Sequence, residues 1–141
     1  MGWVSTRQKE LKDWVHKNQT IFDDSVTVYE ALWNQIVTDI TEAKAEGFPV
    51  DTNGGGYSRK IRLQRLPLAS PNEAKTEVIV QLASDRRSIS VKGNFYQDIV
   101  FALDVCSSGY TCLKFTGTEI SIQDCSQKIL DPMLFPQLRG I

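Results

Sequence analysis

The sequence predicts an α+β domain in which a helical layer packs on one face of an antiparallel sheet. Two observations lead to this fold class. Apolar residues recur at spacings of three, four and seven before the glycine-rich stretch 53–56, and they alternate with period two after it. The connections between the alternating segments are short enough for hairpins and too short for parallel crossovers. We therefore expect one domain over residues 1–141, with a helical layer at 1–47, an antiparallel sheet at 57–123, and a short helix with a tail at 124–141.

The helical layer is predicted from one apolar stripe. Its members are Leu11, Trp14, Val15, Ile21, Phe22, Tyr29, Leu32, Trp33, Ile36, Ile40 and Ala43. Two helices are the preferred division, because Asp23, Asp24 and Ser25 can cap a helix N-terminus and β-branched residues surround them. The stripe keeps its phase through this point, so a single helix of about 40 residues is the alternative. Gly47, followed closely by a proline, is expected to end the layer.

The stretch from Val50 to Gly56 is interpreted as a flexible connection between the helical layer and the sheet. Its three consecutive glycines invite comparison with the loops that cradle phosphate groups. Those loops lead from a strand into a helix and carry a Lys-Ser or Lys-Thr pair. Here the order of elements is reversed and that pair is missing, so the glycines indicate no nucleotide site.

Roughly six short strands are predicted after Tyr57, each with apolar residues at alternate positions. On the face expected to be buried lie Ile61, Leu63, Val78, Val80, Leu82, Ile89, Val91, Ile99, Phe101, Leu103, Val105, Leu113, Phe115, Ile120 and Ile122. On the other face lie Lys60, Arg62, Gln64, Glu77, Gln81, Ser88, Ser90, Lys92, Asp104, Lys114, Glu119 and Ser121, interrupted by Ile79, Val100, Ala102 and Cys112. The sheet should therefore be covered by the helices on one face and meet water on the other.

The C-terminal part predicts a short helix and an apolar tail. Asp124 is expected to cap a helix that runs through Leu130, and Pro132 and Pro136 are expected to break the chain after it. Large apolar residues fill this tail: Met133, Leu134, Phe135 and Leu138. We expect the tail to dock on the body of the domain, because these side chains are too apolar to stay in water. The alternative is that it folds over the apolar residues of the wet face.

Composition and charge are those of a globular protein outside the membrane. The chain is 41% hydrophobic and 23% charged, with a net charge of −1, so it has no overall attraction for nucleic acid or anionic membrane. It begins without a leader pattern and contains no apolar run near the ~20 residues that span a bilayer, so we expect a cytoplasmic location and no membrane partner. The charge is uneven, because residues 57–92 carry eight Lys and Arg against three Asp and Glu.

Three cysteines and a single histidine supply no metal-binding set and no nucleophile–base pair. A reduced set of thiols is the preferred interpretation. Cys106 and Cys112 flank a predicted hairpin turn, so a disulfide between them is the alternative. His16 follows the apolar stripe at its edge and is expected at the surface. We therefore predict no catalytic residue, no metal and no cofactor, and we favour a non-enzymatic role.

The candidate binding residues form a basic cluster. They are Arg59, Lys60, Arg62, Arg65, Arg86 and Arg87. A solvated strand that discourages edge-to-edge pairing is the plainest interpretation. Binding of an anionic protein or small ligand comes next, and single-stranded nucleic acid is the weakest reading, because aromatic residues are sparse and no recognition motif is present.

The leading functional hypothesis is a non-enzymatic binding or regulatory module that acts through the polar sheet face, on a protein partner or on a second copy of the chain. A small-molecule binder or small enzyme is the rival hypothesis. Its pocket would lie between the helices and the sheet, where we expect the aromatic side chains of Trp14, Tyr29, Trp33, Phe101 and Phe115. Nucleic-acid binding through the basic strand is a third and weaker hypothesis.

Overall fold

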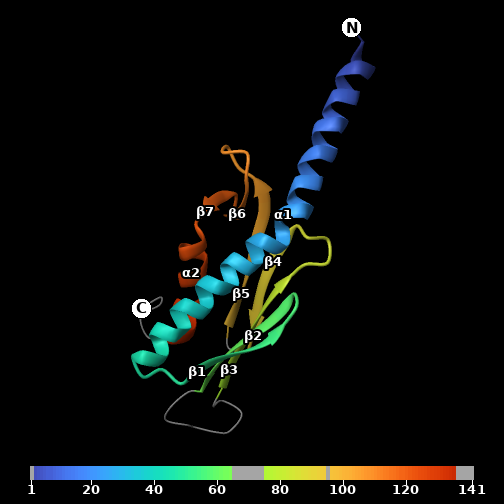
Figure 1. The fold of residues 1–141 in the computed structure, drawn as a ribbon. Coiled ribbons are helices and arrows are strands. Elements are labelled where there is room, and N and C mark those ends of the chain that lie inside the picture. Colours follow the sequence, from blue (N-terminus) through green and yellow to red (C-terminus); the bar gives the residue numbers. More distant parts are fainter. Residues whose placement is uncertain (1, 65–74, 95, 136–141) are drawn as a thin grey trace.

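A computed structural model describes residues 2–64, 75–94 and 96–135 of the chain (Figure 1). The described residues form α1 (Trp3–Ala45), β1 (Val50–Gly55), β2 (Ser58–Gln64), β3 (Lys75–Leu82), β4 (Ser88–Gly93), β5 (Tyr96–Val105), β6 (Thr111–Phe115), β7 (Thr118–Ile120) and α2 (Ile122–Leu134). These strands make one open antiparallel sheet in sequence order, and both helices cover the same face of it. The structure thus confirms the predicted two-layer α+β fold, with one strand more than the sequence indicated.

Helix α1 is continuous, so the preferred division into two helices was wrong and the single-helix alternative is correct. The residues read as caps for a second helix have other roles. Ser25 is fully buried, and its hydroxyl donates to the Phe22 carbonyl oxygen at 2.8 Å. Asp23 accepts a hydrogen bond from Gln19 one turn earlier, and Asp24 accepts one from Thr111 of β6. Because these polar groups are satisfied with the helix intact, nothing forces a break.

Residues 50–55 form strand β1, so their interpretation as a flexible connection was also wrong. β1 pairs with β2 in register from Val50 opposite Leu63 to Gly55 opposite Ser58. The glycines make this hairpin compact. Gly56 turns the chain with a φ of 65°, a conformation that glycine adopts without strain. The buried Val50 is the only large apolar residue of the strand, which is why the alternation is too short to read from sequence.

Most side chains divide between the two faces of the sheet as the alternation predicts, although Ile99, Val105, Phe115, Ile120 and Ile122 are only half-buried. Ile61, Val78, Val80, Ile89, Val91 and Phe101 are completely buried under the helices. On the outer face Lys60, Ile79 and Lys92 lie opposite one another across three strands, and Arg62 lies opposite Glu77 across two. The described part of the tail does not cover this face, because Val100 at its middle is 52% exposed.

Helix α2 begins earlier and ends later than predicted. Its N-cap is Ser121, whose hydroxyl oxygen accepts from the Asp124 backbone N–H at 3.1 Å, so the assignment of Asp124 as the cap and of residues 121–122 to a strand was wrong. The helix also continues through Pro132, contrary to expectation. Met133 is buried and the Phe135 ring packs edge-on against Phe48, so this part of the tail docks on the body as predicted. Leu138 and Pro136 lie outside the described residues.

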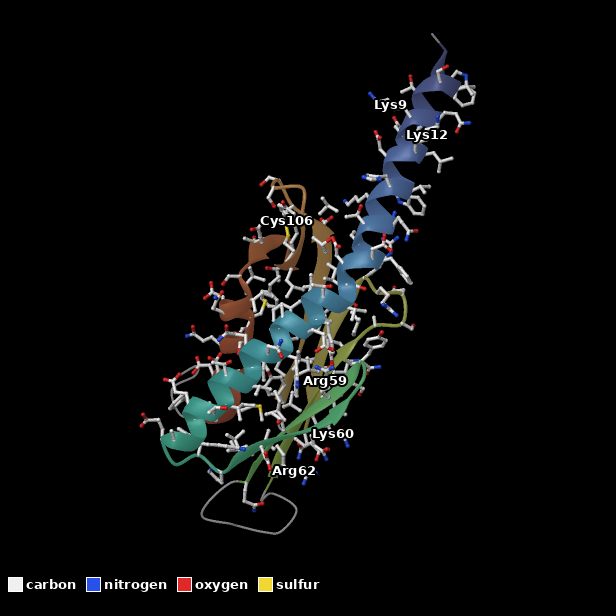
Figure 2. All side chains as sticks on the ribbon, in the orientation of Figure 1. Lys9, Lys12, Arg59, Lys60, Arg62 and Cys106 are labelled. Carbon is white, nitrogen blue, oxygen red and sulfur yellow. A yellow bond between two sulfur atoms is a disulfide. The ribbon has the colours of Figure 1, made fainter. Side chains whose placement is uncertain are left out.

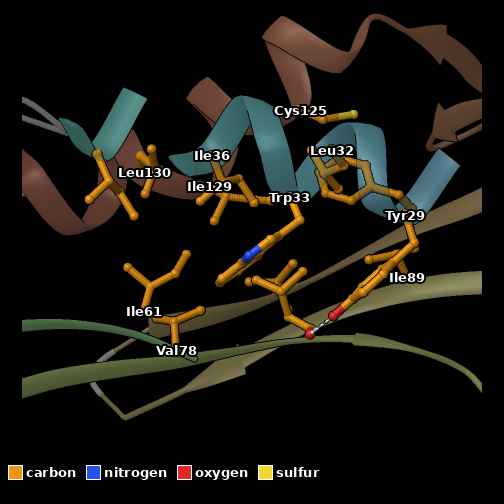
Figure 3. Close-up of a cluster of buried hydrophobic side chains, with 14 of the residues drawn as sticks. Tyr29, Leu32, Trp33, Ile36, Ile61, Val78, Ile89, Cys125, Ile129 and Leu130 are labelled. Carbon is orange, nitrogen blue, oxygen red and sulfur yellow. Dashed lines mark hydrogen bonds between the residues drawn. The ribbon is translucent and has the colours of Figure 1, made fainter. Parts of the chain in front are cut away.

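The core lies between α1, α2 and the inner face of the sheet (Figure 3). Tyr29, Leu32 and Ile36 of α1 are completely buried there. The Tyr29 hydroxyl crosses the interface and donates to the Val80 carbonyl oxygen of β3 at 2.7 Å. Since each group is buried, this hydrogen bond sets where α1 sits over the sheet.

Cys106 and Cys112 are joined in a disulfide that closes the β5–β6 hairpin (Figure 2). Their Cα atoms lie 6.0 Å apart, within the range that disulfides span. The preferred interpretation of a fully reduced thiol set was therefore wrong, and the cross-hairpin alternative is correct. Cys125 is the remaining thiol. It is buried, and burial raises its pKa to about 12, so it stays protonated and unreactive at neutral pH.

Reduction of this disulfide is expected to destabilise the protein by about 2 kcal/mol, the amount that closing so short a loop removes from the entropy of the unfolded chain. Thermal unfolding with and without a dithiol reductant measures the effect. The double variant Cys106→Ser, Cys112→Ser is the control, and its melting temperature should match that of the reduced protein and not respond to reductant. Equal melting temperatures for the oxidised and reduced wild type would contradict the prediction.

Candidate functional site

The sheet separates the predicted basic cluster into groups that do not share a surface (Figure 2). Arg59 has the parity of the buried residues and lies beneath α1, with only 12% of its side chain exposed. Its two terminal nitrogens bind the Glu30 carboxylate at 3.0 and 2.5 Å. The guanidinium also lies 5.3 and 5.6 Å from the ring centroids of Tyr29 and Trp33. Arg59 therefore links the two layers of the fold.

The charges of the Arg59–Glu30 pair stabilise each other. Hydrogen bonding to Arg59 holds the pKa of Glu30 below its usual value, and hydrogen bonding to Glu30 raises the pKa of Arg59. Such a bidentate pair is the arrangement in which arginine gains most from a carboxylate. The positive charge of Arg59 is therefore paired with Glu30 inside the molecule and does not contribute to a basic binding surface.

Lys60 and Arg62 point to the opposite side, onto the outer face of the sheet. Both contact the Glu77 carboxylate of β3, at 3.5 and 3.3 Å. Two cations sharing one carboxylate leave a weak positive charge on this face, which gives little basis for binding an extended anion. Arg65 lies outside the described residues.

Arg86 and Arg87 lie in the turn between β3 and β4, away from Lys60 and Arg62. Arg86 adopts a φ of 62°, which is rare for a residue with a side chain. Its guanidinium lies 5.0 and 4.8 Å from the ring centroids of Phe22 and Tyr57. Arg86 therefore packs the turn against α1.

The interface between helices and sheet, where the rival hypothesis put a pocket, is filled by side chains (Figure 3). Tyr29, Trp33 and Phe101 are buried in it, and Phe115 is half-buried at its edge. Trp14, which we expected at this interface, lies outside it and is 58% exposed. One groove of about 510 Å³ lies elsewhere, between the exposed sides of α1 and α2, where Asp39, Glu42, Asp131 and Phe135 are among its lining residues.

Among the residues that the structure describes, Cys106, Cys112 and Glu119 have ligand atoms close enough together to hold a metal ion. Both sulfurs are bonded to each other in the disulfide, so neither can act as the thiolate ligand that a metal requires. His16 is exposed on α1, and among the described residues its imidazole forms no hydrogen bond or ion pair with an acid or thiol. The geometry around these residues points to no chemical step.

The most unusual surface is one that the sequence did not single out. The first turns of α1, Trp3 to His16, extend past the sheet into solvent (Figures 1 and 2). A helix of 43 residues is about 65 Å long, whereas a strand of ten residues spans about 33 Å. The helix is therefore too long for the sheet to cover. We call Trp3–His16 the projecting segment.

The projecting segment carries the same apolar stripe that is buried further along α1. Leu11, Val15 and Phe22 are exposed members of the stripe, and Val4 extends it toward the N-terminus, whereas Ile21 and most members after Phe22 are buried. Positions 4, 8, 11, 15, 18 and 22 alternate spacings of four and three and so lie along one line on the helix surface. We call these six positions, Val4, Gln8, Leu11, Val15, Asn18 and Phe22, the projecting seam.

An uncovered seam of this kind is unfavourable in water. Val4, Leu11, Val15 and Phe22 are each about half exposed, and Trp3 is 77% exposed. A helix end that makes no tertiary contact must rely on its own propensity, which is marginal for a segment of this length. Large apolar residues gathered in one line on a surface are the pattern of a contact surface. The projecting seam is therefore the candidate functional site.

The base of the projecting segment is fixed to the sheet by charge. Lys17 of α1 binds one oxygen of the Asp104 carboxylate at 2.9 Å, and Lys114 of β6 binds the other at 3.0 Å. The hydrogen bond from Lys17, followed by that from Lys114, lowers the pKa of Asp104 to about 2 from its ordinary 3.8. Asp104 thus fixes α1 to the sheet at the point where the projecting segment begins.

Stability is expected to fall as pH is lowered through this group. The folded-state pKa lies below the unfolded one, so the contribution is complete above about pH 4 and is lost between about pH 4 and pH 2. We expect about 1 kcal/mol, allowing for solvent screening at a partly exposed site. Asp104→Asn should be less stable than the wild type at neutral pH, and urea unfolding should show the gap closing toward pH 2. A gap that is constant over this range would contradict the assignment.

No protein-family model, curated protein or solved structure matches this chain. Within the described ranges, none of the helices combines the length and the apolar character that crossing a membrane requires.

Proposed function

We propose that this protein is a non-enzymatic protein-binding module, and that the projecting seam is its binding surface. The observation that carries the proposal is that apolar residues continue along α1 past the end of the sheet, where Val4, Leu11, Val15 and Phe22 are all exposed. Further along α1 the same stripe packs against the chain's own sheet and forms the core. A surface of this kind is therefore buried wherever a matching apolar surface faces it. The cytoplasmic location expected from the sequence stays a proposal, and the disulfide between Cys106 and Cys112 counts against it, because disulfides are rare in that compartment.

Charge favours a protein as the partner. Residues 2–24 contain four Lys and Arg and four Asp and Glu, so this part of α1 has no net charge. Helices that bind anionic lipid surfaces or nucleic acid carry an excess of basic residues. Acidic residues lie among the basic ones here, as in the ion pair between Arg7 and Glu10 at 2.9 Å. An apolar seam with balanced charges beside it is the pattern of helix-to-helix recognition.

The outer face of the sheet, our first hypothesis from sequence, stays a second candidate surface. Val100 and Ile79 give it an apolar centre, and Lys92 is among the charged residues around them. Its cations Lys60 and Arg62 share the carboxylate of Glu77. Of the large apolar residues that the structure describes there, only Val100 is exposed, whereas all four apolar residues of the projecting seam are. We therefore rank it below the seam.

Paired variants test the proposal. Leu11→Asp with Val15→Asp places two charges in the projecting seam, while Thr6→Asp with His16→Asp adds two aspartates to other exposed positions of the same helix. The wild type and the control pair should associate with protein, either with themselves in light scattering or with a partner captured from an extract of the source cells. The seam variant should not.

Two results would overturn the proposal. One is a wild type that is monomeric and retains nothing that the seam variant loses. The other is seam-dependent binding to phosphatidylserine–phosphatidylcholine vesicles without any protein partner, since this would make the seam a membrane contact.

A further inference from the structure

We infer that the partner is a second copy of this chain, and that the two projecting seams pair in antiparallel orientation with Leu11 of one copy against the partner's Val15. This inference rests on the proposed function and names the partner of the same surface. It follows from three features of the structure: where the sheet begins to cover α1, how the seam residues are spaced, and how charge is distributed along the segment.

The position of the sheet excludes a parallel pair. From Ile21 onward most of the apolar stripe is buried under the domain's own sheet, and by its helical spacing the projecting seam lies on the same side of α1. A parallel copy would bring its sheet to the same end of the helix pair, into the space of the first sheet. An antiparallel copy puts the two sheets at opposite ends and leaves the projecting segments free to meet.

The spacing of the seam selects a register. The seam has two alternating sets of positions, 4, 11, 18 and 8, 15, 22. In an antiparallel helix pair a position of one set faces a position of the other set. All six positions find a partner when the two facing residue numbers add up to 26. Val4 then faces the partner's Phe22, whose ring already contacts Arg86 of its own chain and is 49% exposed, and Leu11 faces the partner's Val15. Gln8 faces the partner's Asn18, an amide pair of the kind that fixes register at some cost in affinity. Asn18 already donates to the Trp14 carbonyl oxygen at 2.8 Å, so one of its donors is satisfied before pairing.

Charge favours the same orientation. Residues 2–12 contain three basic residues and one acidic residue, whereas residues 13–24 contain one basic residue and three acidic residues. Their net charges are +2 and −2. An antiparallel pair places each positive half beside a negative half, whereas a parallel pair places like charges together.

The N-terminal end of each helix lies beside the body of the other copy in this arrangement. The antiparallel register brings the first turn of each helix, with Trp3, opposite Phe22 and Asp23 of the other copy. A groove of about 280 Å³ lies beside this part of α1, lined by Trp14, Val15, Asn18, Gln19, Ile21 and Phe22 of the helix and by Asp85 and Arg87 of the β3–β4 turn. In the antiparallel register the partner's segment from Val4 to Lys12 runs along this groove. The exposed indole of Trp14 lies beside the two-fold axis.

The contact is expected to be of moderate strength. About 20 residues of each helix, some 30 Å, take part. Two helices of this length bury surface at the low end of the about 1,200–2,000 Å² that stable interfaces bury. We therefore expect a dimer that forms and dissociates with concentration in the micromolar range.

Sedimentation of the full-length protein over a range of concentrations tests the inference. The wild type should shift from its 15.9 kDa monomer to twice that mass, and Thr6→Asp with His16→Asp should behave alike. Leu11→Asp with Val15→Asp should raise the dissociation constant by about 100-fold or more, because it buries charges in an apolar seam. A wild type that stays monomeric but captures a different protein through the seam overturns this inference alone. A monomer that captures nothing overturns the proposed function as well.

Cross-linking tests the orientation. In the antiparallel register Lys12 lies next to the partner's Lys12, and Ser5 lies next to the partner's Gln19. A short bismaleimide should therefore join Lys12→Cys to itself. It should join Ser5→Cys to Gln19→Cys only when the two variants are mixed. A seam-dependent dimer in which Lys12→Cys does not cross-link, or in which Leu11→Cys joins itself instead, would overturn the antiparallel arrangement.

Discussion

Gly93→Ala is expected to destabilise the protein by about 3 kcal/mol or more, because the added methyl group has no space. Gly93 ends β4 and lies opposite Val78 of β3, next to an irregularity in the pairing of β4 with β5. A Cβ atom there would lie 2.2 Å from the Glu77 carbonyl oxygen and 2.9 Å from the Val78 Cα atom. Both neighbours are backbone atoms in the middle of the sheet, so relief of the clash requires β3 and β4 to separate.

Urea unfolding measures the loss, and Gly55→Ala is the matched control. Gly55 also lies at the end of a strand, but a Cβ atom at this position meets nothing within 4 Å. The control should unfold within about 1 kcal/mol of the wild type. Equal unfolding midpoints for Gly93→Ala and Gly55→Ala would contradict the packing described for β3 and β4.

Tyr29→Ala is expected to cost about 3–5 kcal/mol, the usual loss when a large aromatic side chain leaves a core. Tyr29 is completely buried, and its ring packs edge-on against Tyr57 with centroids 6.4 Å apart. Burial raises the pKa of its hydroxyl to about 12, so the group stays a hydrogen-bond donor to Val80. The substitution removes packing and the hydrogen bond between the layers together.

Tyr29→Phe separates these two contributions. It keeps the ring and removes only the donor to the Val80 carbonyl oxygen, which should cost about 1–2 kcal/mol. Calorimetric or urea unfolding of the two variants gives the comparison. If Tyr29→Phe were as destabilising as Tyr29→Ala, the hydrogen bond and not the ring would hold the layers together. If neither variant changed stability, Tyr29 would not occupy the interface at all.

The architecture was predictable from sequence because it depends on period alone. Alternate residues of a strand face opposite sides, so Ile61 and Leu63 on one parity and Lys60 and Arg62 on the other could be assigned without knowing the strand order. The same rule places Arg59 on the buried side. The parity of Arg59 could thus be read from the sequence. We missed it because we grouped the basic residues by their closeness in the chain and not by parity.

Other features depend on tertiary contacts that no local pattern contains. Ser25 looks like a helix cap in sequence, and only its burial against the sheet shows why the helix continues. The β1 strand has one large buried residue, Val50, and exists because β2 supplies its hydrogen bonds. The disulfide between Cys106 and Cys112 depends on register, which the sequence leaves open.

The projecting seam was visible in sequence as part of a longer apolar stripe. What the sequence could not show is where the sheet under that stripe ends. Leu11 and Val15 have the same helical spacing as Leu32 and Ile36, yet the first two are exposed and the last two are buried. The difference comes from the length of the strands and the angle at which α1 crosses them, and so it appears only in three dimensions.

Hydrogen exchange of the α1 amides at two protein concentrations tests the central claim most directly. If a second copy covers the projecting seam, the amides of residues 4–16 should exchange slowly in concentrated protein and rapidly after dilution, while those of residues 32–40 in the core stay slow in both. Rapid exchange of residues 4–16 at every concentration would show that no second copy covers the seam, and would contradict the account.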